Sequence, residues 1–98
     1  MKNFLFTFLL FTTVTVFGQS THETAYSFMK VGDHDNAILV LNKALQNTPN
    51  DEQLLQDIAL AYFYKKDFAQ AQVYAKKLID RDEVDVASYQ IAGSVFRA

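Results

Sequence analysis

The stretch AYSFMKVGDHDNAILVLNKALQNTPN, residues 25–50, contains two helical segments and the turns that end them. Gly32-Asp33 interrupts the first segment, because glycine readily leaves the helical conformation and aspartate caps a following helix. Thr48-Pro49-Asn50 ends the second segment, because proline cannot continue a helix. This stretch predicts a helix–turn–helix unit.

The helical pattern continues on both sides of this unit. From residue 20 to residue 98 the chain has one proline, no strand-like alternation of any length, and frequent Ala, Leu, Gln, Lys and Asp. Ser20-Thr21-His22-Glu23 has the Ser-x-x-Glu form of a capping box. Helices are predicted over residues 21–31, 35–47, 52–65, 68–80 and 86–97. The predicted fold class is therefore all-α.

The pattern repeats every 34 residues. In rows of this length, small residues share one column and aromatic residues share another. The small residues are Ala25, Ala59 and Gly93, and the aromatic residues are Phe28, Tyr62 and Phe96. Further columns pair Asp33 with Asp67, Ala37 with Ala71, Lys43 with Lys77, Leu45 with Ile79, and Asp51 with Asp85. A helix–turn–helix period of 34 residues indicates an array of stacked repeats.

These columns resemble the tetratricopeptide repeat, in which a small residue and an aromatic residue on the first helix meet two alanines on the second. The first repeat is the better match, with Ala25, Phe28, Gly32-Asp33, Ala37-Ile38, Lys43-Ala44-Leu45 and Pro49-Asn50, and it departs at Thr21. The second repeat keeps Leu55, Ile58, Ala59, Tyr62, Phe68 and Ala71. It departs at Lys66, Leu78 and Glu83, where the family has glycine, alanine and proline, and we expect these departures to loosen its turns.

The resemblance implies helix–turn–helix repeats stacked as a short right-handed α-solenoid. It divides the chain into repeat 1 at residues 19–51, repeat 2 at residues 52–85, and the first helix of an incomplete repeat 3 at residues 86–98. Residues 1–18 stand outside the array and are interpreted as a signal peptide.

The signal peptide is predicted from an uncharged, Phe-rich and Leu-rich run over residues 4–17 that follows Lys2. Val16 and Gly18 suit the positions three and one before a cleavage site, so we expect cleavage between Gly18 and Gln19. The alternative is an uncleaved membrane anchor, but a spanning helix needs about 20 apolar residues. The prediction is an exported protein, periplasmic or secreted, without stable membrane insertion after cleavage.

The third repeat begins with Tyr89, Gly93 and Phe96 on one helical face and then lacks a second helix. Arrays of this kind usually end in a helix with a polar outer surface. Two interpretations follow. Either the sequence is the front part of a longer repeat protein, or another chain completes the open face. The second interpretation predicts a homodimer through Tyr89, Gly93 and Phe96.

The sequence offers no catalytic, metal or cofactor site. It has no cysteine, and His22 and His34 lack zinc-ligand spacing. Asp80-Arg81-Asp82 lacks the glycine and the terminal glutamate of a calcium loop. The net charge is −2 and the lysines and arginines are dispersed, which disfavours nucleic acid as a partner. The protein is therefore predicted not to be an enzyme and to need no cofactor.

A binding function fits the sequence better, because stacked helix pairs form a concave surface lined mainly by the first helix of each repeat. The resemblance implies a groove for a protein or peptide partner. The predicted contact residues are Tyr26, Met29, Gln56, Leu60, Phe63, Tyr64, Gln90 and Arg97. The alternative for the aromatic residues Phe63 and Tyr64 is that they pack on a neighbouring helix.

The function predicted from the sequence is thus a non-catalytic protein-interaction module that binds a peptide or partner helix on its concave face. The alternative is the truncated front end of a longer exported repeat protein, which serves as a sensor or scaffold for a signalling or assembly complex. The resemblance does not extend to the carboxylate clamp by which some family members hold chaperone C-termini, because His22, Tyr26 and Gln56 stand at the matching positions.

Overall fold

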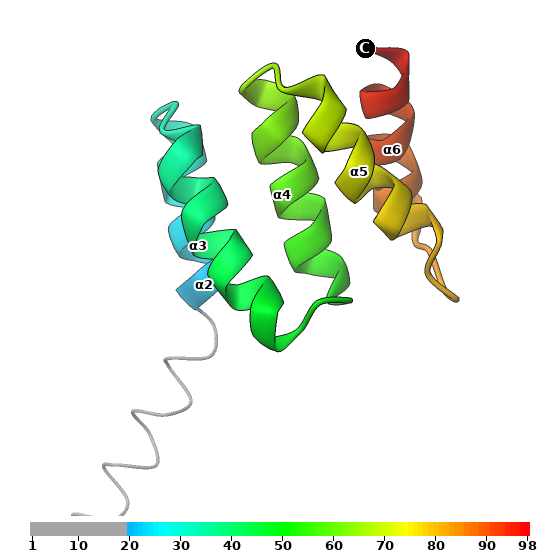
Figure 1. Ribbon diagram of the computed structural model, residues 1–98, viewed down its shortest axis with the longest axis horizontal. Coiled ribbons are helices and arrows are strands. Elements are labelled where there is room, and N and C mark those ends of the chain that lie inside the picture. The colour runs from blue at the N-terminus through cyan, green and yellow to red at the C-terminus, as the bar shows by residue number, and fades with distance from the viewer. Residues whose placement is uncertain (1–19) are drawn as a thin grey trace, which may run out of the picture.

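The computed structural model describes residues 20–98, which form helices only (Figure 1). The helices are α2 (Ser20–Lys30), α3 (His34–Asn47), α4 (Glu52–Tyr64), α5 (Phe68–Ile79) and α6 (Val86–Arg97). Each predicted helix is present, with ends that differ from the prediction by one residue at most. The all-α fold class is confirmed. The predicted signal peptide and its cleavage site lie outside the described residues.

Aspartate begins four of these helices. Asp33, Asp51, Asp67 and Asp85 are the N-caps of α3, α4, α5 and α6, and each side chain accepts a hydrogen bond from the backbone N–H three residues later. A carboxylate at this position satisfies a free N–H group and interacts favourably with the positive end of the helix dipole. The repeated aspartate columns of the sequence therefore mark where the helices start.

The turns inside the two repeats have the same geometry. Gly32 has φ +79° and Lys66 has φ +70°, so both are left-handed. In the first turn the N–H of Asp33 donates to the carbonyl of Phe28, at 2.8 Å, and in the second the N–H of Asp67 donates to Tyr62, at 3.0 Å. The expectation that Lys66 loosens its turn is therefore wrong. The hydrogen bonds impose the left-handed conformation, and Lys66 adopts it in place of glycine.

The helices pack in two layers. Each helix contacts the next along the chain, and α4 also contacts α2 and α6. Figure 1 shows α3 and α5 in front, with α2 behind α3 and α6 behind α5. The first helices of the repeats, α2, α4 and α6, thus form one layer, and the second helices, α3 and α5, form the other.

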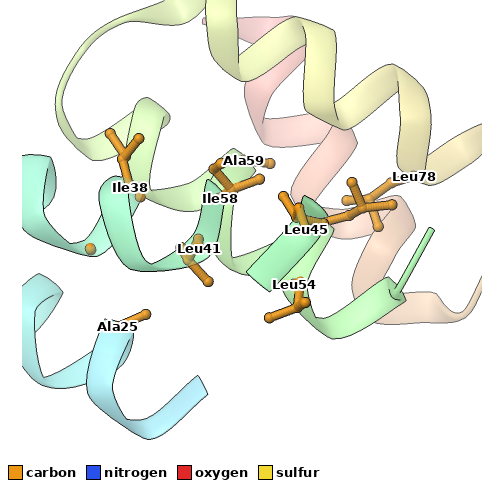
Figure 2. Close-up of a cluster of buried hydrophobic side chains, with 11 residues drawn as sticks. Ala25, Ile38, Leu41, Leu45, Leu54, Ile58, Ala59 and Leu78 are labelled. Atoms are coloured by element: carbon orange, nitrogen blue, oxygen red, sulfur yellow. The ribbon is translucent and has the colours of Figure 1, made fainter. Parts of the chain in front are cut away.

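The main hydrophobic core lies between α2, α3 and α4, and Leu78 of α5 joins it (Figure 2). Ala25, Ala37 and Ala59 are completely buried, so small side chains lie where the helix backbones approach each other. Leu41 and Ile58 fill the space between them. A second cluster joins α5 to α6 through Ala71, Ala75, Ala92 and Val95. None of the helices formed by residues 20–98 has the length and apolar character that crossing a membrane requires.

Candidate functional site

The predicted groove residues lie on the layer of α2, α4 and α6, and their exposure varies. Tyr26 on α2 and Tyr64 at the end of α4 are 56% and 55% exposed. Gln90 and Arg97 on α6 are exposed as well. Met29, Leu60 and Phe63 are half-buried. The two tyrosines are therefore the most accessible aromatic side chains of the predicted set.

Gln56 takes part in the contact between α4 and α6. It is 9% exposed, and its amide nitrogen lies 2.8 Å from the hydroxyl oxygen of Ser88 and 3.3 Å from a carboxylate oxygen of Asp85. The Ser88 hydroxyl donates in turn to Glu52, at 3.0 Å. This polar network holds the start of α6 against α4 and leaves little of Gln56 for a partner.

Met29 and Phe63 also contribute to packing. Met29 contacts the main core cluster, and Phe63 contacts the second cluster. The rings of Phe63 and Phe68 meet edge to face, with centroids 5.7 Å apart. Phe63 therefore packs on the neighbouring helix α5, as the alternative interpretation of this residue proposed, while Tyr64 remains accessible.

A row of rings crosses the end of the array where α3 and α5 begin and α4 ends. It runs from His34 to Tyr64 (6.2 Å between centroids), then to Phe63 (5.7 Å) and Phe68 (5.7 Å). We call these four residues the aromatic row. Sequence reasoning did not assign His34 and Phe68 to the site. A signal was present, because the two residues occupy the same column of the 34-residue period, at the start of the second helix of each repeat.

A hollow of about 370 Å³ lies beside this row. Its walls come from the turn between α2 and α3 and from the end of α4, including His34, Tyr64 and Lys66. The ammonium of Lys65 lies 2.6 Å from a carboxylate oxygen of Asp35 and links the two walls. The hollow has both charged and aromatic walls, as surfaces that hold polypeptide chains often do.

A polar contact joins α2 to α4 on the predicted groove surface. Nδ1 of His22 lies 2.6 Å from a carboxylate oxygen of Asp57, and the amide of Gln53 donates to the other oxygen, at 3.0 Å. Burial raises the pKa of the Asp57 carboxyl, and the hydrogen bonds from His22 and Gln53 oppose that rise. Because His22 is 46% exposed and Asp57 is buried, the contact positions α2 more than it offers a free acid or base.

Within residues 20–98 no group of three or more His, Cys, Asp or Glu side chains is arranged to hold a metal ion. The acidic residues Asp33, Asp51, Asp67 and Asp85 each cap a helix, and Asp57 has two hydrogen-bonded neighbours. The features that stand out on the surface are accessible aromatic side chains, which are suited to contact with another polypeptide.

The comparison with protein families agrees with this architecture. The tetratricopeptide repeat model matches residues 23–51 and again residues 52–85, which together are more than half of the chain. No curated protein and no solved structure matches the chain. With two consecutive matches that coincide with the helix pairs α2–α3 and α4–α5, the chain belongs to the tetratricopeptide repeat family.

Proposed function

We propose that this protein is a non-catalytic interaction module that binds a peptide or a partner helix on the surface formed by α2, α4 and α6. Membership of the tetratricopeptide repeat family implies protein partners. The observation that carries the more specific proposal is the accessibility of Tyr26 and Tyr64, each more than half exposed on this layer. Tyrosine buries a large area on binding and is frequent among the residues that dominate interface energies.

The surroundings of the two tyrosines support this binding mode. Tyr64 lies in the aromatic row and borders the hollow beside α4, so a partner side chain can pack against several rings at once. The ammonium of Lys30 lies 5.6 Å from the ring centroid of Tyr26, which adds a positive charge to the other end of the surface. We propose Leu60, Gln90 and Arg97 as further contacts, with Met29, Phe63 and Gln56 in supporting positions.

The test is site-specific crosslinking. A photoreactive phenylalanine replaces Tyr64 in one variant and Leu39 in another, because Leu39 is 67% exposed on α3, in the other layer. We expect one discrete adduct from position 64 and none from position 39. The same adduct from both positions, or none from position 64 in the presence of a partner that binds, would contradict the proposed surface.

Point substitutions provide the matching affinity measurement. Once the crosslinked partner is identified, Tyr64→Ala is expected to weaken binding about tenfold or more, because removal of a central aromatic contact typically lowers affinity by that much. Leu39→Ala is the control for loss of an exposed apolar side chain and should bind as the wild type does. Equal affinities for the two variants would contradict a role for Tyr64.

We further propose that the protein is exported and acts in the periplasm or outside the cell. The apolar run of residues 4–17 after Lys2 supports this proposal. Intact-mass measurement of the protein recovered from an exporting host is expected to show a chain that begins at Gln19. A chain that still begins at Met1 and stays with the membrane fraction would support the uncleaved anchor instead.

A second proposal is that the chain is the front end of a longer exported scaffold or sensor. One observation favours it: Tyr89 and Phe96 of α6 are exposed, whereas the corresponding residues of α4 pack against α5. Reading the genomic sequence beyond the codon for Ala98 tests it, since further repeat sequence in the same frame is expected. A second copy of the chain is another candidate partner for this face of α6.

A further inference from the structure

One face of α6 is uncovered by the described residues. The small residues Ala25 and Ala59 are completely buried where the two helices of their repeats meet. Gly93 occupies the same column, yet it is partly exposed, and a Cβ atom added there would meet nothing within 4 Å. The position that packs against a second helix in the first two repeats is therefore open to solvent in α6.

The neighbours of Gly93 on this face are large and exposed. Tyr89 is 59% exposed and Phe96 is 48% exposed. Their counterparts in α4 are Leu55, which is 1% exposed, and Tyr62, which is half-buried and stacks on Tyr74 of α5 with centroids 5.7 Å apart. The side chains that join α4 to α5 thus have equivalents on α6 that contact water.

The open face has an apolar side and a polar side. At 100° per residue, Val86 and Gly93 lie along its midline, Tyr89 and Phe96 lie to one side, and Gln90 and Arg97 lie to the other. All of these except Gly93 are classed as exposed, and Val86 is 72% exposed. The buried residues Ser88, Ala92 and Val95 lie on the opposite side of the helix.

We propose that two copies of this chain associate through the open faces of α6, with the two helices antiparallel and related by a twofold axis near Gly93. This proposal concerns a different surface from the groove and does not depend on peptide binding. The absence of a side chain at Gly93 lets the two backbones approach closely. Tyr89 of each copy then packs against the partner's Phe96, which covers four exposed rings.

The antiparallel orientation follows from the two sides of the face. In this orientation the polar sides also meet, so Arg97 of each copy lies beside the partner's Gln90. The guanidinium also approaches the first turn of the partner helix, where Asp85 and Glu83 place negative charge. A parallel arrangement would set aromatic side chains against polar ones and bring the acidic starts of both helices together. Charge complementarity therefore selects a second copy in the antiparallel orientation.

The contact involves little more than one short helix from each copy. A stable interface usually buries about 800 Å² on each partner, and one face of a 12-residue helix provides less than that. The expected dimer is therefore weak, with a dissociation constant on the order of 10–100 μM. It should form at high protein concentration and dissociate on dilution.

Sedimentation velocity over a range of concentrations tests the proposal on the full chain as recovered from an exporting host. Gly93→Leu is the key variant, because its side chain meets nothing within the monomer and blocks the approach of a second helix. We expect the wild type to dimerise and Gly93→Leu to remain monomeric with unchanged helix content. Leu39→Ala controls for surface apolarity and should dimerise normally. A wild type that is monomeric at about 1 mM, as when another segment or partner uses this face, overturns the proposal.

A charge reversal tests the orientation. Arg97→Glu places a carboxylate beside the partner's Gln90 and near its acidic helix start, so we expect dimerisation to weaken about tenfold. Adding Gln90→Arg to the same chain should restore the dimer, because each new arginine then meets the partner's glutamate. Within one chain positions 90 and 97 are about 10 Å apart and do not pair. Failure of the second substitution to restore association overturns the antiparallel arrangement.

Discussion

Ala25, Ala37 and Ala59 show how small side chains set the spacing of the helices. All three are completely buried, and the larger core residues pack around them. A bulkier side chain at such a position has no space to enter, so the helices would have to separate. The regular column of small residues in the sequence has this packing as its physical cause.

Asp57 is the residue whose ionisation should affect stability. Its carboxyl has a pKa raised from an ordinary value near 3.8, chiefly because it is buried beside α2. Between that value and the higher pKa of the folded state, the folded protein holds a proton that the unfolded chain has released. The free energy of unfolding should therefore fall as pH rises through this window, because the folded state must then hold a buried carboxylate.

The variant Asp57→Asn isolates this effect. Asparagine keeps the shape of the side chain and carries no charge at any pH, so its free energy of unfolding lacks this dependence. We expect the variant to gain stability relative to the wild type between about pH 3 and pH 6, as measured by urea denaturation at each pH. Asp82→Asn, at an exposed acidic residue, is the control. A stability difference that does not change with pH would argue against a raised pKa at Asp57.

Helix α4 shows how one element serves two interfaces at once. Its core residues Leu54, Leu55, Ile58 and Ala59 are buried, and the same helix contacts α2, α3, α5 and α6. Gln56 and Asp57 are buried as well, each with polar partners on the adjacent first helix. Two amphipathic neighbours would require only one apolar stripe, whereas a central helix of an array is enclosed on several sides.

The turn between α4 and α5 provides a test at the same scale. Lys66 has φ +70°, a conformation that costs a non-glycine residue about 1 kcal/mol. Lys66→Gly should therefore raise the free energy of unfolding by about 0.5–1 kcal/mol in chemical denaturation. The opposite change, Gly32→Ala, should lower it by about 1 kcal/mol, since the added methyl group meets nothing and only the backbone is affected. Equal and small effects of both changes would contradict the left-handed turn.

The molecule as a whole is an array in which helices contact their neighbours in sequence and in layer. Stability in such an array is approximately a sum of local interfaces, so its ends can open while the middle stays folded. The terminal helix α6 is attached by the second core cluster and by the Ser88 network with α4.

Removal of the Ser88 hydroxyl should reveal this local stability. Ser88 is completely buried, and its hydroxyl bonds to both Gln56 and Glu52, so Ser88→Ala leaves two polar groups without a partner. We expect a loss of about 1–3 kcal/mol. Amide hydrogen exchange should increase in α6 and the end of α5 but not in α2 and α3. Ser27→Ala, at an exposed serine of α2, is the control. A uniform increase along the chain would instead indicate one cooperative unit.

The sequence alone was sufficient to predict the helices, their caps and the repeat. A period of 34 residues, aspartate at the helix starts and small residues at fixed columns are local or periodic signals, and each reflects one physical constraint. The exposed tyrosines of the groove followed from the same register. The groove itself and the partner it holds remain proposals.

The tertiary structure decided which side chains remain accessible. Gln56 and Phe63 look like surface residues in the repeat register, but α6 and α5 cover them, whereas Tyr26 and Tyr64 stay exposed. The aromatic row depends on the positions of three helix ends, and Lys66 adopts a turn that its residue type disfavours. Periodicity in a sequence specifies which face of a helix is apolar. Burial depends on which neighbour lies against that face, and this is decided only when the helices pack.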